Sequence, residues 1–289
     1  RGRRAERKRY RPDTFARAPR RNGMAPTVHL IDRGTMEIDV NYPLEGAVTA
    51  TASNPNPDAV RADGPVFNLV IETDEQTLLW DTGSHPEAGD GHWPPALYDE
   101  FTHHDADEHP LPDALAEAGF ELADIDAVVQ SHLHLDHAGG LHNFAGTDVP
   151  VYVHDAELKH AYFEAVTSDT SAYVRGDFDH DLAWEPLYGD GGYLADGVDW
   201  VHLPGHTPGL VGLVVEGGAA DGRDLIIAGD LAYSAANYED GHPMGRDLLH
   251  SRPDWEASCR RVRDIEARRG ALVVYGHDPG QVAALPDLL

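Results

Sequence analysis

The sequence predicts an α/β fold, and two features of the chain support this prediction. Short apolar runs, which are typical of buried strands, occur together with segments of helical period. Several of these runs end in histidine or aspartate, the position at which α/β folds gather their functional groups. We therefore expect the chemistry of this protein to lie at the carboxyl ends of its strands.

The individual elements follow from the same patterns. Strands are expected at 27–31, 36–40, 66–72, 77–81, 126–131, 150–154, 198–203, 210–216, 224–229 and 271–276. Helices are expected at 111–118, 139–145, 155–165 and 253–269. The last helix begins with a capping box formed by Ser251 and Asp254. Its apolar residues recur at helical spacing: Trp255, Cys259, Val262 and Ile265. This spacing places the thiol of Cys259 in the core.

Two long segments lack such patterns. Residues 47–65 are rich in proline, asparagine and alanine and are expected to form a loop. Residues 84–110 form a longer irregular segment, and long loops in compact domains are commonly functional lids. Within it, Trp93, Leu97 and Phe101 have the spacing of a short amphipathic helix. These side chains would either cover a pocket or pack in the core, and the sequence leaves both open.

One motif concentrates potential metal ligands. The segment His132-Leu133-His134-Leu135-Asp136-His137 is followed by two glycines that let the chain turn. In an extended segment, His132 and His134 point the same way and can hold one ion. Asp136 and His137 could serve a second ion, and this donor set favours zinc over magnesium or calcium. The alternative is a polar loop in a chain that has 18 histidines.

Further ligands stand in similar settings elsewhere in the chain. His206 lies in a turn after a strand, and Asp230 and His277 each end a short apolar run. Sorted by type, the candidates form two sets around two ions, with Asp230 bridging both: His132, His134 and His206 for one ion, and Asp136, His137 and His277 for the other. Each ion would keep room for a solvent ligand.

This series of motifs resembles the metallo-β-lactamase superfamily. His-x-His-x-Asp-His is followed by a Gly-His turn, a Gly-Asp strand end and a Gly-His strand end, in the family's order from about residue 66 to 278. Asp81, in Asp81-Thr82-Gly83, matches an early motif that has a structural role behind the ligands in that family. The resemblance implies a four-layer αβ/βα sandwich whose two halves are related by pseudo-symmetry.

The motifs are similar, more narrowly, to those of the N-acyl homoserine lactonases, the quorum-quenching branch. Asp230-Leu231-Ala232-Tyr233 and Gly276-His277-Asp278 carry this resemblance, because that branch places a carbonyl-polarising tyrosine three residues after the bridging aspartate. It implies a hydroxide, bridging two divalent ions, that attacks the lactone carbonyl. Tyr233 would stabilise the oxyanion and Asp136 would protonate the leaving ring oxygen. The ions are expected to be zinc, with manganese, cobalt and iron as alternatives.

Other functions within the same fold stay open. A glyoxalase II-like thioesterase, a β-lactamase or a different lactonase would use a similar ligand set. The alternative role for Tyr233 is an ordinary core tyrosine. Leu135 stands where members of the lactonase branch often carry phenylalanine, so a smaller side chain there would reshape the acyl pocket. A non-catalytic or nucleic-acid-processing relative is disfavoured, because the full ligand set is present and no basic RNA-binding module is evident.

The composition constrains the protein further. The chain has 289 residues, enough for one hydrolase domain over 24–289, with no second domain needed. The formal net charge is −28, and Lys8 and Lys159 are the only lysines. Such acidity is typical of adaptation to concentrated salt, although a lineage with acidic, GC-biased usage is the alternative. The single cysteine excludes an internal disulfide. We expect a cytoplasmic monomer or homodimer that acts on a small-molecule lactone.

Residues 1–23 differ from the rest of the chain. They carry ten cations against Glu6 and Asp13, and they lack the apolar core of a signal peptide. Because Met24-Ala25-Pro26 is typical of a natural start, we expect 1–23 to be a disordered or non-native extension. An arm that binds nucleic acid is the alternative, but the acidic remainder of the chain would repel a polyanion. No run approaches the roughly 20 apolar residues of a membrane helix.

Overall fold

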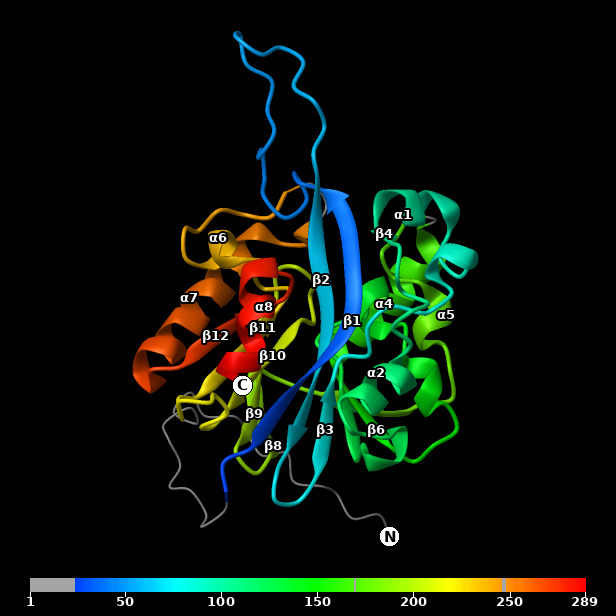
Figure 1. Ribbon diagram of the computed structural model, residues 1–289, viewed down its shortest axis with the longest axis vertical. Coiled ribbons are helices and arrows are strands. Elements are labelled where there is room, and N and C mark those ends of the chain that lie inside the picture. Colours follow the sequence, from blue (N-terminus) through cyan, green and yellow to red (C-terminus); the bar gives the residue numbers. More distant parts are fainter. Residues whose placement is uncertain (1–23, 169, 246–247) are drawn as a thin grey trace.

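The computed structural model describes residues 24–168, 170–245 and 248–289, so the basic segment 1–23 lies outside the described residues. Runs of consecutive strands, β1 to β3 and β7 to β11, are separated by segments that contain helices (Figure 1). The strands are β1 (Thr27–Asp39), β2 (Arg61–Glu72), β3 (Thr77–Trp80), β4 (Thr102–His103), β5 (Ala127–Val129), β6 (Pro150–His154), β7 (Ala183–Leu187), β8 (Gly191–Ala195), β9 (Val198–His202), β10 (Val211–Val215), β11 (Leu225–Gly229) and β12 (Leu272–Tyr275). The helices are α1 (Pro95–Glu100), α2 (Leu111–Glu117), α3 (Leu135–Ala138), α4 (Asp155–Thr167), α5 (Arg175–Phe178), α6 (Ala235–Tyr238), α7 (Arg252–Arg269) and α8 (Pro279–Leu288), with 3₁₀ turns η1 (Ala88–Asp90), η2 (Leu122–Asp124) and η3 (Leu141–Phe144).

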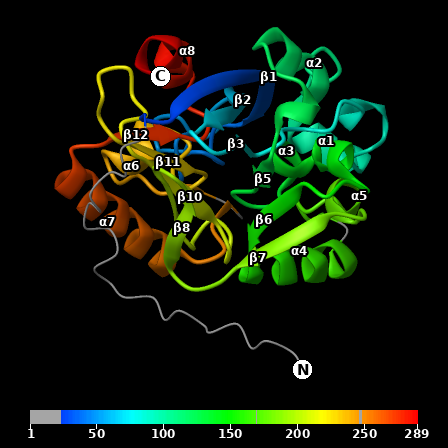
Figure 2. The same ribbon diagram turned by 90° about the horizontal axis from the view of Figure 1, so that it is seen from below.

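The strands form two sheets that pack face to face. One sheet has the order β4-β1-β2-β3-β5-β6-β7, and the other has the order β12-β11-β10-β9-β8. Figure 2 shows α7 on the outer side of the second sheet and α2 and α4 on the outer side of the first. A buried apolar cluster between the sheets joins Leu69 and Trp80 to Leu213 and Ile227. Two further clusters fill the space between each sheet and its helices. The predicted four-layer αβ/βα sandwich is therefore confirmed.

Every predicted strand is present, but two of the predicted strands form one continuous strand. The segments 27–31 and 36–40 form the single strand β1, which continues through a bulge between Asp32 and Thr35. Gly34 in this bulge has φ +85°, a conformation that side chains with a Cβ rarely adopt. The strands that sequence analysis missed, β4, β7 and β8, all lie at sheet edges. Strands β7 and β8 are partly exposed and lack the apolar runs by which strands are recognised, and β4 has only two residues.

Two expectations need correction, and one helix was missed. The loop predicted at 47–65 ends earlier, because β2 begins at Arg61 and pairs with the end of β1; the segment before it projects away from the body (Figure 1). The helix predicted at 139–145 is replaced by α3, which ends at Ala138, and by the 3₁₀ turn η3. The glycines between them pass tightly against neighbouring backbone, where Gly139 has room for no Cβ. Helix α8 was not predicted, and its interior Pro286 obscures the helical pattern.

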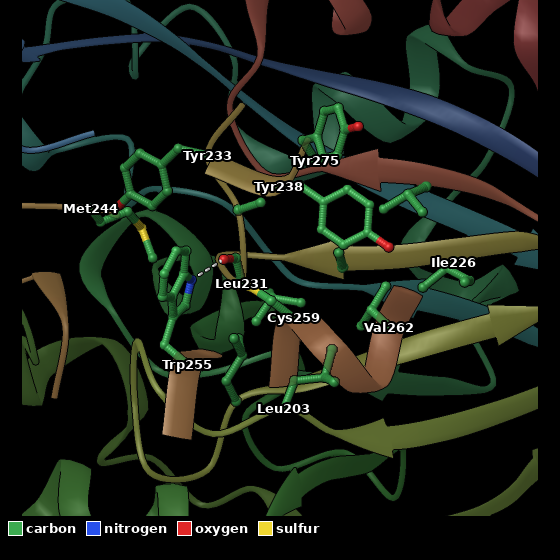
Figure 3. Close-up of a cluster of buried hydrophobic side chains, with 14 of the residues drawn as sticks. Leu203, Ile226, Leu231, Tyr233, Tyr238, Met244, Trp255, Cys259, Val262 and Tyr275 are labelled. Atoms are coloured by element: carbon green, nitrogen blue, oxygen red, sulfur yellow. Dashed lines mark hydrogen bonds between the residues drawn. The ribbon is translucent and has the colours of Figure 1, made fainter. Parts of the chain in front are cut away.

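Helix α7 forms as the sequence predicts. The Ser251 hydroxyl accepts a hydrogen bond from the Asp254 backbone N–H and so caps the helix. Its apolar face is buried, and the thiol of Cys259 lies in the core as expected. Figure 3 shows how Trp255 lies beneath Leu231 and donates its indole N–H to the Leu231 carbonyl over 2.7 Å. Helix α7 thereby fixes the segment that follows β11. No helix in the described ranges is long and apolar enough to cross a membrane.

A buried arginine holds the segment after β3 in place. Arg33, at the β1 bulge, is 2% exposed and donates to the Asn68 side chain and to three backbone carbonyls. Two of those carbonyls belong to Thr82 and Ser84, directly after the Asp81 position. Thr82 in turn donates, from its backbone N–H and from its hydroxyl, to the carbonyl of His137. Arg33 therefore connects the bulge in β1 to the ligand segment.

Replacing this arginine should destabilise the fold strongly. Arg33→Met leaves three buried acceptors and the half-buried carbonyl of His109 without this donor, so we expect the free energy of unfolding to fall by about 3 kcal/mol. Arg223→Met is the matched control, because Arg223 is exposed and, among the described residues, its side chain pairs with the neighbouring Asp221. We expect a change of less than about 0.5 kcal/mol. Urea denaturation of both variants measures the difference. Equal stabilities would contradict the role given to Arg33.

Candidate metal centre

The predicted ligands all follow strands of the two sheets. His132, His134, Asp136 and His137 come after β5, and α3 begins inside this segment. His134 takes the position before the helix with an extended backbone, so Asp136 and His137 lie in its single turn. His206, Asp230 and His277 come after β9, β11 and β12 of the other sheet. The described structure thus brings together histidines and aspartates that are up to 145 positions apart (His132 and His277).

These side chains gather into groups that could each hold an ion. In the first group the possible ligand atoms all lie within 4.8 Å of one another: His132, His134 and His206. The same is true of the second group: Asp136, His137 and His277. Both groups correspond to the sets expected from the sequence. A third combination, formed by His132, His137 and Asp230, joins members of the two groups.

Asp230 lies between the two groups. Its Oδ2 is 3.4 Å from Nε2 of His206 and 3.8 Å from Nε2 of His132. Its Oδ1 is 3.4 Å from Nε2 of His137 and 3.2 Å from Nε2 of His277. Each carboxylate oxygen therefore faces one of the groups, which is the arrangement that a ligand bridging two ions would need.

The residues present fit divalent metal ions. Five of their ligand atoms are buried and make no hydrogen bond: Nε2 of His132, His137 and His277, Oδ2 of Asp136 and Oδ1 of Asp230. Buried polar atoms nearly always have a partner, so unpaired atoms that converge on one place indicate a cation. Imidazole and carboxylate donors suit zinc and similar metals, whereas calcium and magnesium prefer oxygen alone.

Hydrogen bonds behind the imidazoles fix their orientation. Nδ1 of His206 donates to the carbonyl of Leu248 over 2.6 Å, and Nδ1 of His277 donates to the carbonyl of Pro65 over 2.9 Å. The hydroxyl of Ser131 lies 2.9 Å from Nδ1 of His132. With the back nitrogen protonated, Nε2 of each ring presents its lone pair to the centre. Sequence reasoning did not predict these contacts, since two of the three partners are backbone carbonyls far along the chain.

Asp81 lies behind the centre, where the sequence resemblance put it. It has φ +56°, the only such value of a non-glycine residue among the described positions. In this conformation its carboxylate accepts from the backbone N–H and hydroxyl of Ser131 over 2.6 and 2.7 Å. It also lies 2.9 Å from Nδ1 of His137. Asp81 therefore positions the ligand segment at both of its ends.

The electrostatic surroundings favour neutral imidazoles in the first group and a charged Asp136 in the second. Burial lowers the pKa of His132, His134 and His206, so these imidazoles are neutral at pH 7 and their lone pairs are free. Burial opposes ionisation of Asp136, but the neighbouring His137 and His277 lower its pKa to about 2. Its carboxylate is therefore charged at neutral pH and available to a cation.

Tyr233 lies beside the centre. Its ring centroid is 4.6 Å from that of His277 and 6.0 Å from that of His206. Burial and the charge of Asp230 raise the pKa of Tyr233 well above its usual value, so the phenol keeps its proton and can donate it. The carbonyl of Tyr233 accepts from the backbone N–H of His277 over 2.9 Å. Asp278 caps α8 and also accepts a hydrogen bond from the N–H of Ala235. This second hydrogen bond fixes the segment that bears Tyr233.

The side chains expected to line a substrate pocket are packed together. Trp93, Leu97 and Leu135 are buried in one apolar cluster, at 0%, 4% and 2% exposure. Phe101 is partly buried and packs on Tyr42 with ring centroids 5.0 Å apart. The helix expected over 93–101 is the shorter α1, which begins after Pro94. The cluster thus brings the segment 84–110 and Leu135 of the ligand segment into contact.

Comparison with known proteins agrees with this fold. The family model described as "Metallo-beta-lactamase superfamily" matches residues 61–277. Among curated proteins, the N-acyl homoserine lactonase AiiB of Agrobacterium fabrum is 30% identical over 273 residues, which covers 91% of this chain and 97% of the relative. The N-acyl homoserine lactonase AttM of Rhizobium johnstonii is 32% identical over 230 residues, covering 74% of this chain and 81% of the relative.

Solved structures show the same architecture. An N-acyl homoserine lactone hydrolase with the product N-hexanoyl-L-homoserine at its catalytic metal center superposes with a TM-score of 0.76 and 22% identity, over 92% of this chain and 100% of that one. The dizinc quorum-quenching lactonase AidC matches with a TM-score of 0.58 and 18% identity, over 89% and 90%. The chain therefore belongs to the metallo-beta-lactamase superfamily and is a hydrolase of that superfamily.

Proposed function

We propose that this protein opens the lactone ring of N-acyl homoserine lactones with the help of two divalent metal ions, which the donor set suggests are zinc. One observation carries the proposal: two groups of buried ligands lie on either side of Asp230. The curated relatives named N-acyl homoserine lactonases support the choice of substrate. The product is an N-acyl homoserine.

The ions, when bound, lower the pKa of water and polarise a carbonyl group. We propose that the first group, with Asp230, holds one ion and that the second group, with Asp230, holds the other. The protonated hydroxyl of Tyr233 then donates to the carbonyl oxygen of the lactone as negative charge develops there. Asp136 accepts a proton as water adds to the carbonyl and passes it to the ring oxygen as the C–O bond breaks.

An apolar cluster next to the ligand segment is the candidate binding site for the acyl chain. The apolar cluster of Trp93, Leu97 and Leu135 adjoins that segment through Leu135, and Phe101 is its partly exposed edge. We propose that the acyl chain packs against this edge. We propose that Leu135, at the position where the lactonase branch often carries phenylalanine, shapes this acyl site with a smaller side chain.

A panel of substrates tests the proposed function. N-acyl homoserine lactones, simple lactones, thioesters and β-lactams are assayed with zinc, manganese and cobalt. The proposal expects the highest kcat/KM for the acyl homoserine lactones and loss of activity after chelation, with recovery when metal is returned. A preference for thioesters or β-lactams would replace this proposal with another hydrolase activity of the same fold.

Removing a ligand should remove one ion. His134→Ala takes one donor from the first group, so we expect about one ion per chain instead of two and turnover that is too slow to detect. His104→Ala is the matched control, since the His104 side chain is 70% exposed and belongs to none of the groups. Metal analysis and a lactonase assay measure both effects. Full turnover by metal-free protein would end the proposal.

Removing the Tyr233 hydroxyl should slow the reaction without loss of metal. Tyr233→Phe removes a donor to the developing oxyanion, and we expect kcat to fall by about 10- to 100-fold. Tyr238→Phe is the control, because its hydroxyl bonds Glu266 over 2.7 Å, away from the ligand groups. If Tyr233→Phe lost metal, the tyrosine would have a structural role instead.

The acidic composition supports a further proposal, that the protein is adapted to concentrated salt. The described residues all lie within 24–289, and without the basic segment 1–23 this part has a more negative net charge than the whole chain. Salt shortens the electrostatic screening length from about 10 Å at 0.1 M to about 3 Å at 1 M, and this weakens the repulsion between surface carboxylates. The free energy of unfolding should therefore rise with NaCl, measured by circular dichroism. If the stability stays constant, the acidic composition would instead reflect a lineage with acidic, GC-biased residue usage and no salt requirement.

A further inference from the structure

Glu157 is a buried carboxylate whose role the proposed reaction does not explain. It lies in the first turn of α4 and has 0% exposure. A buried charge is costly unless its oxygens are well satisfied. The partners of Glu157 are uncharged: its Oε1 accepts from the N–H of Leu133 over 3.1 Å and from the Tyr173 hydroxyl over 2.9 Å, and its Oε2 accepts from the N–H of Gly209 over 3.1 Å.

Each of these partners belongs to a segment that carries or contacts a histidine of the first group. Leu133 stands between His132 and His134, so its N–H orients the extended segment from which both rings project. The ring of Tyr173 packs against His134 with centroids 4.5 Å apart. One carboxylate therefore fixes the backbone between two ligands and the aromatic surface behind one of them.

The third partner belongs to the turn that carries His206. Gly209 is three residues after His206 and approaches α4 so closely that an added Cβ would lie 2.2 Å from the backbone nitrogen of Glu157. Only glycine permits this approach, and the approach brings the Gly209 N–H to the carboxylate. Glu157 thus joins the ligand segment of one sheet to the ligand turn of the other.

The second group is held by other means. Asp81 binds Nδ1 of His137, and the carbonyl of Pro65 binds Nδ1 of His277. We propose that Glu157 is a positioning residue for the first group alone: it holds His132, His134 and His206 in register, so that its loss weakens the ion held there while the ion of Asp136, His137 and His277 remains. This inference rests on the proposed pair of ions.

Zinc binding tests the inference directly. Glu157→Ala leaves the N–H groups of Leu133 and Gly209 unpaired and frees both segments, so we expect at least about tenfold weaker binding of one zinc ion and unchanged binding of the other. Glu157→Gln retains a single acceptor oxygen and should have an intermediate effect. Glu266→Gln is the matched control, because Glu266 also accepts from a tyrosine hydroxyl, that of Tyr238. Equilibrium dialysis followed by metal analysis measures both ions.

Double variants identify the ion that is lost. At a free zinc concentration that leaves the weakened site of Glu157→Ala empty, adding His206→Ala should change the zinc content no further, because both substitutions affect the same ion. Adding His277→Ala should remove the remaining ion. The inference is overturned if Glu157→Ala binds both ions as tightly as the unaltered protein, or if it loses the ion of the second group.

Two further measurements keep the outcomes separate. If Glu157→Ala does not fold, Tyr173→Phe removes one hydrogen bond and retains the ring against His134; weaker binding of the first ion is expected, and unchanged binding overturns the inference. If the unaltered protein binds two zinc ions but opens no acyl homoserine lactone, the proposed substrate is wrong while the inference on Glu157 stands.

Discussion

The centre of this protein depends on the burial of a carboxylate among imidazoles. Asp230 is 1% exposed, and each of its oxygens faces nitrogen atoms of a different ligand group. Burying a charge without a partner is costly, so the arrangement is favourable when cations lie between these groups. The surrounding structure serves to hold the donors at this spacing, since ligands that can rotate away bind metal weakly.

The support of the ligands comes largely from groups that touch backbone. Arg33 holds the carbonyls after Asp81, and Asp81 holds the N–H of Ser131. Glu157 does the same for the N–H groups of Leu133 and Gly209. An arginine bonded to carbonyls and carboxylates bonded to amides can define the path of irregular segments, which have no ladder of their own. The strands of the layered core fix where these irregular segments begin and end, and the buried charged side chains fix the backbone conformation between those ends.

The sequence predicted the layers and the ligand groups because both depend on local patterns. Apolar runs identify central strands, and a run such as Leu225–Gly229 is directly followed by Asp230. Strands β7 and β8 were missed because they are partly exposed, and β4 because it has two residues. The helix expected at 139–145 begins earlier, as α3 at Leu135, and continues only as a 3₁₀ turn. Arg33 and Glu157 could not be found, since their partners lie far away along the chain and a lone arginine or glutamate carries no pattern. Their importance is visible only in three dimensions.

Each ligand group takes members from both sheets: His206 joins residues of the β5 segment in one group, and His277 joins them in the other. An ion bound to either group therefore cross-links the two halves of the sandwich. By linkage, the free energy of unfolding then increases with the logarithm of the free ion concentration. Metal supply would set the lifetime of the folded protein as well as its activity, so that starvation for the ion exposes the chain to unfolding and proteolysis.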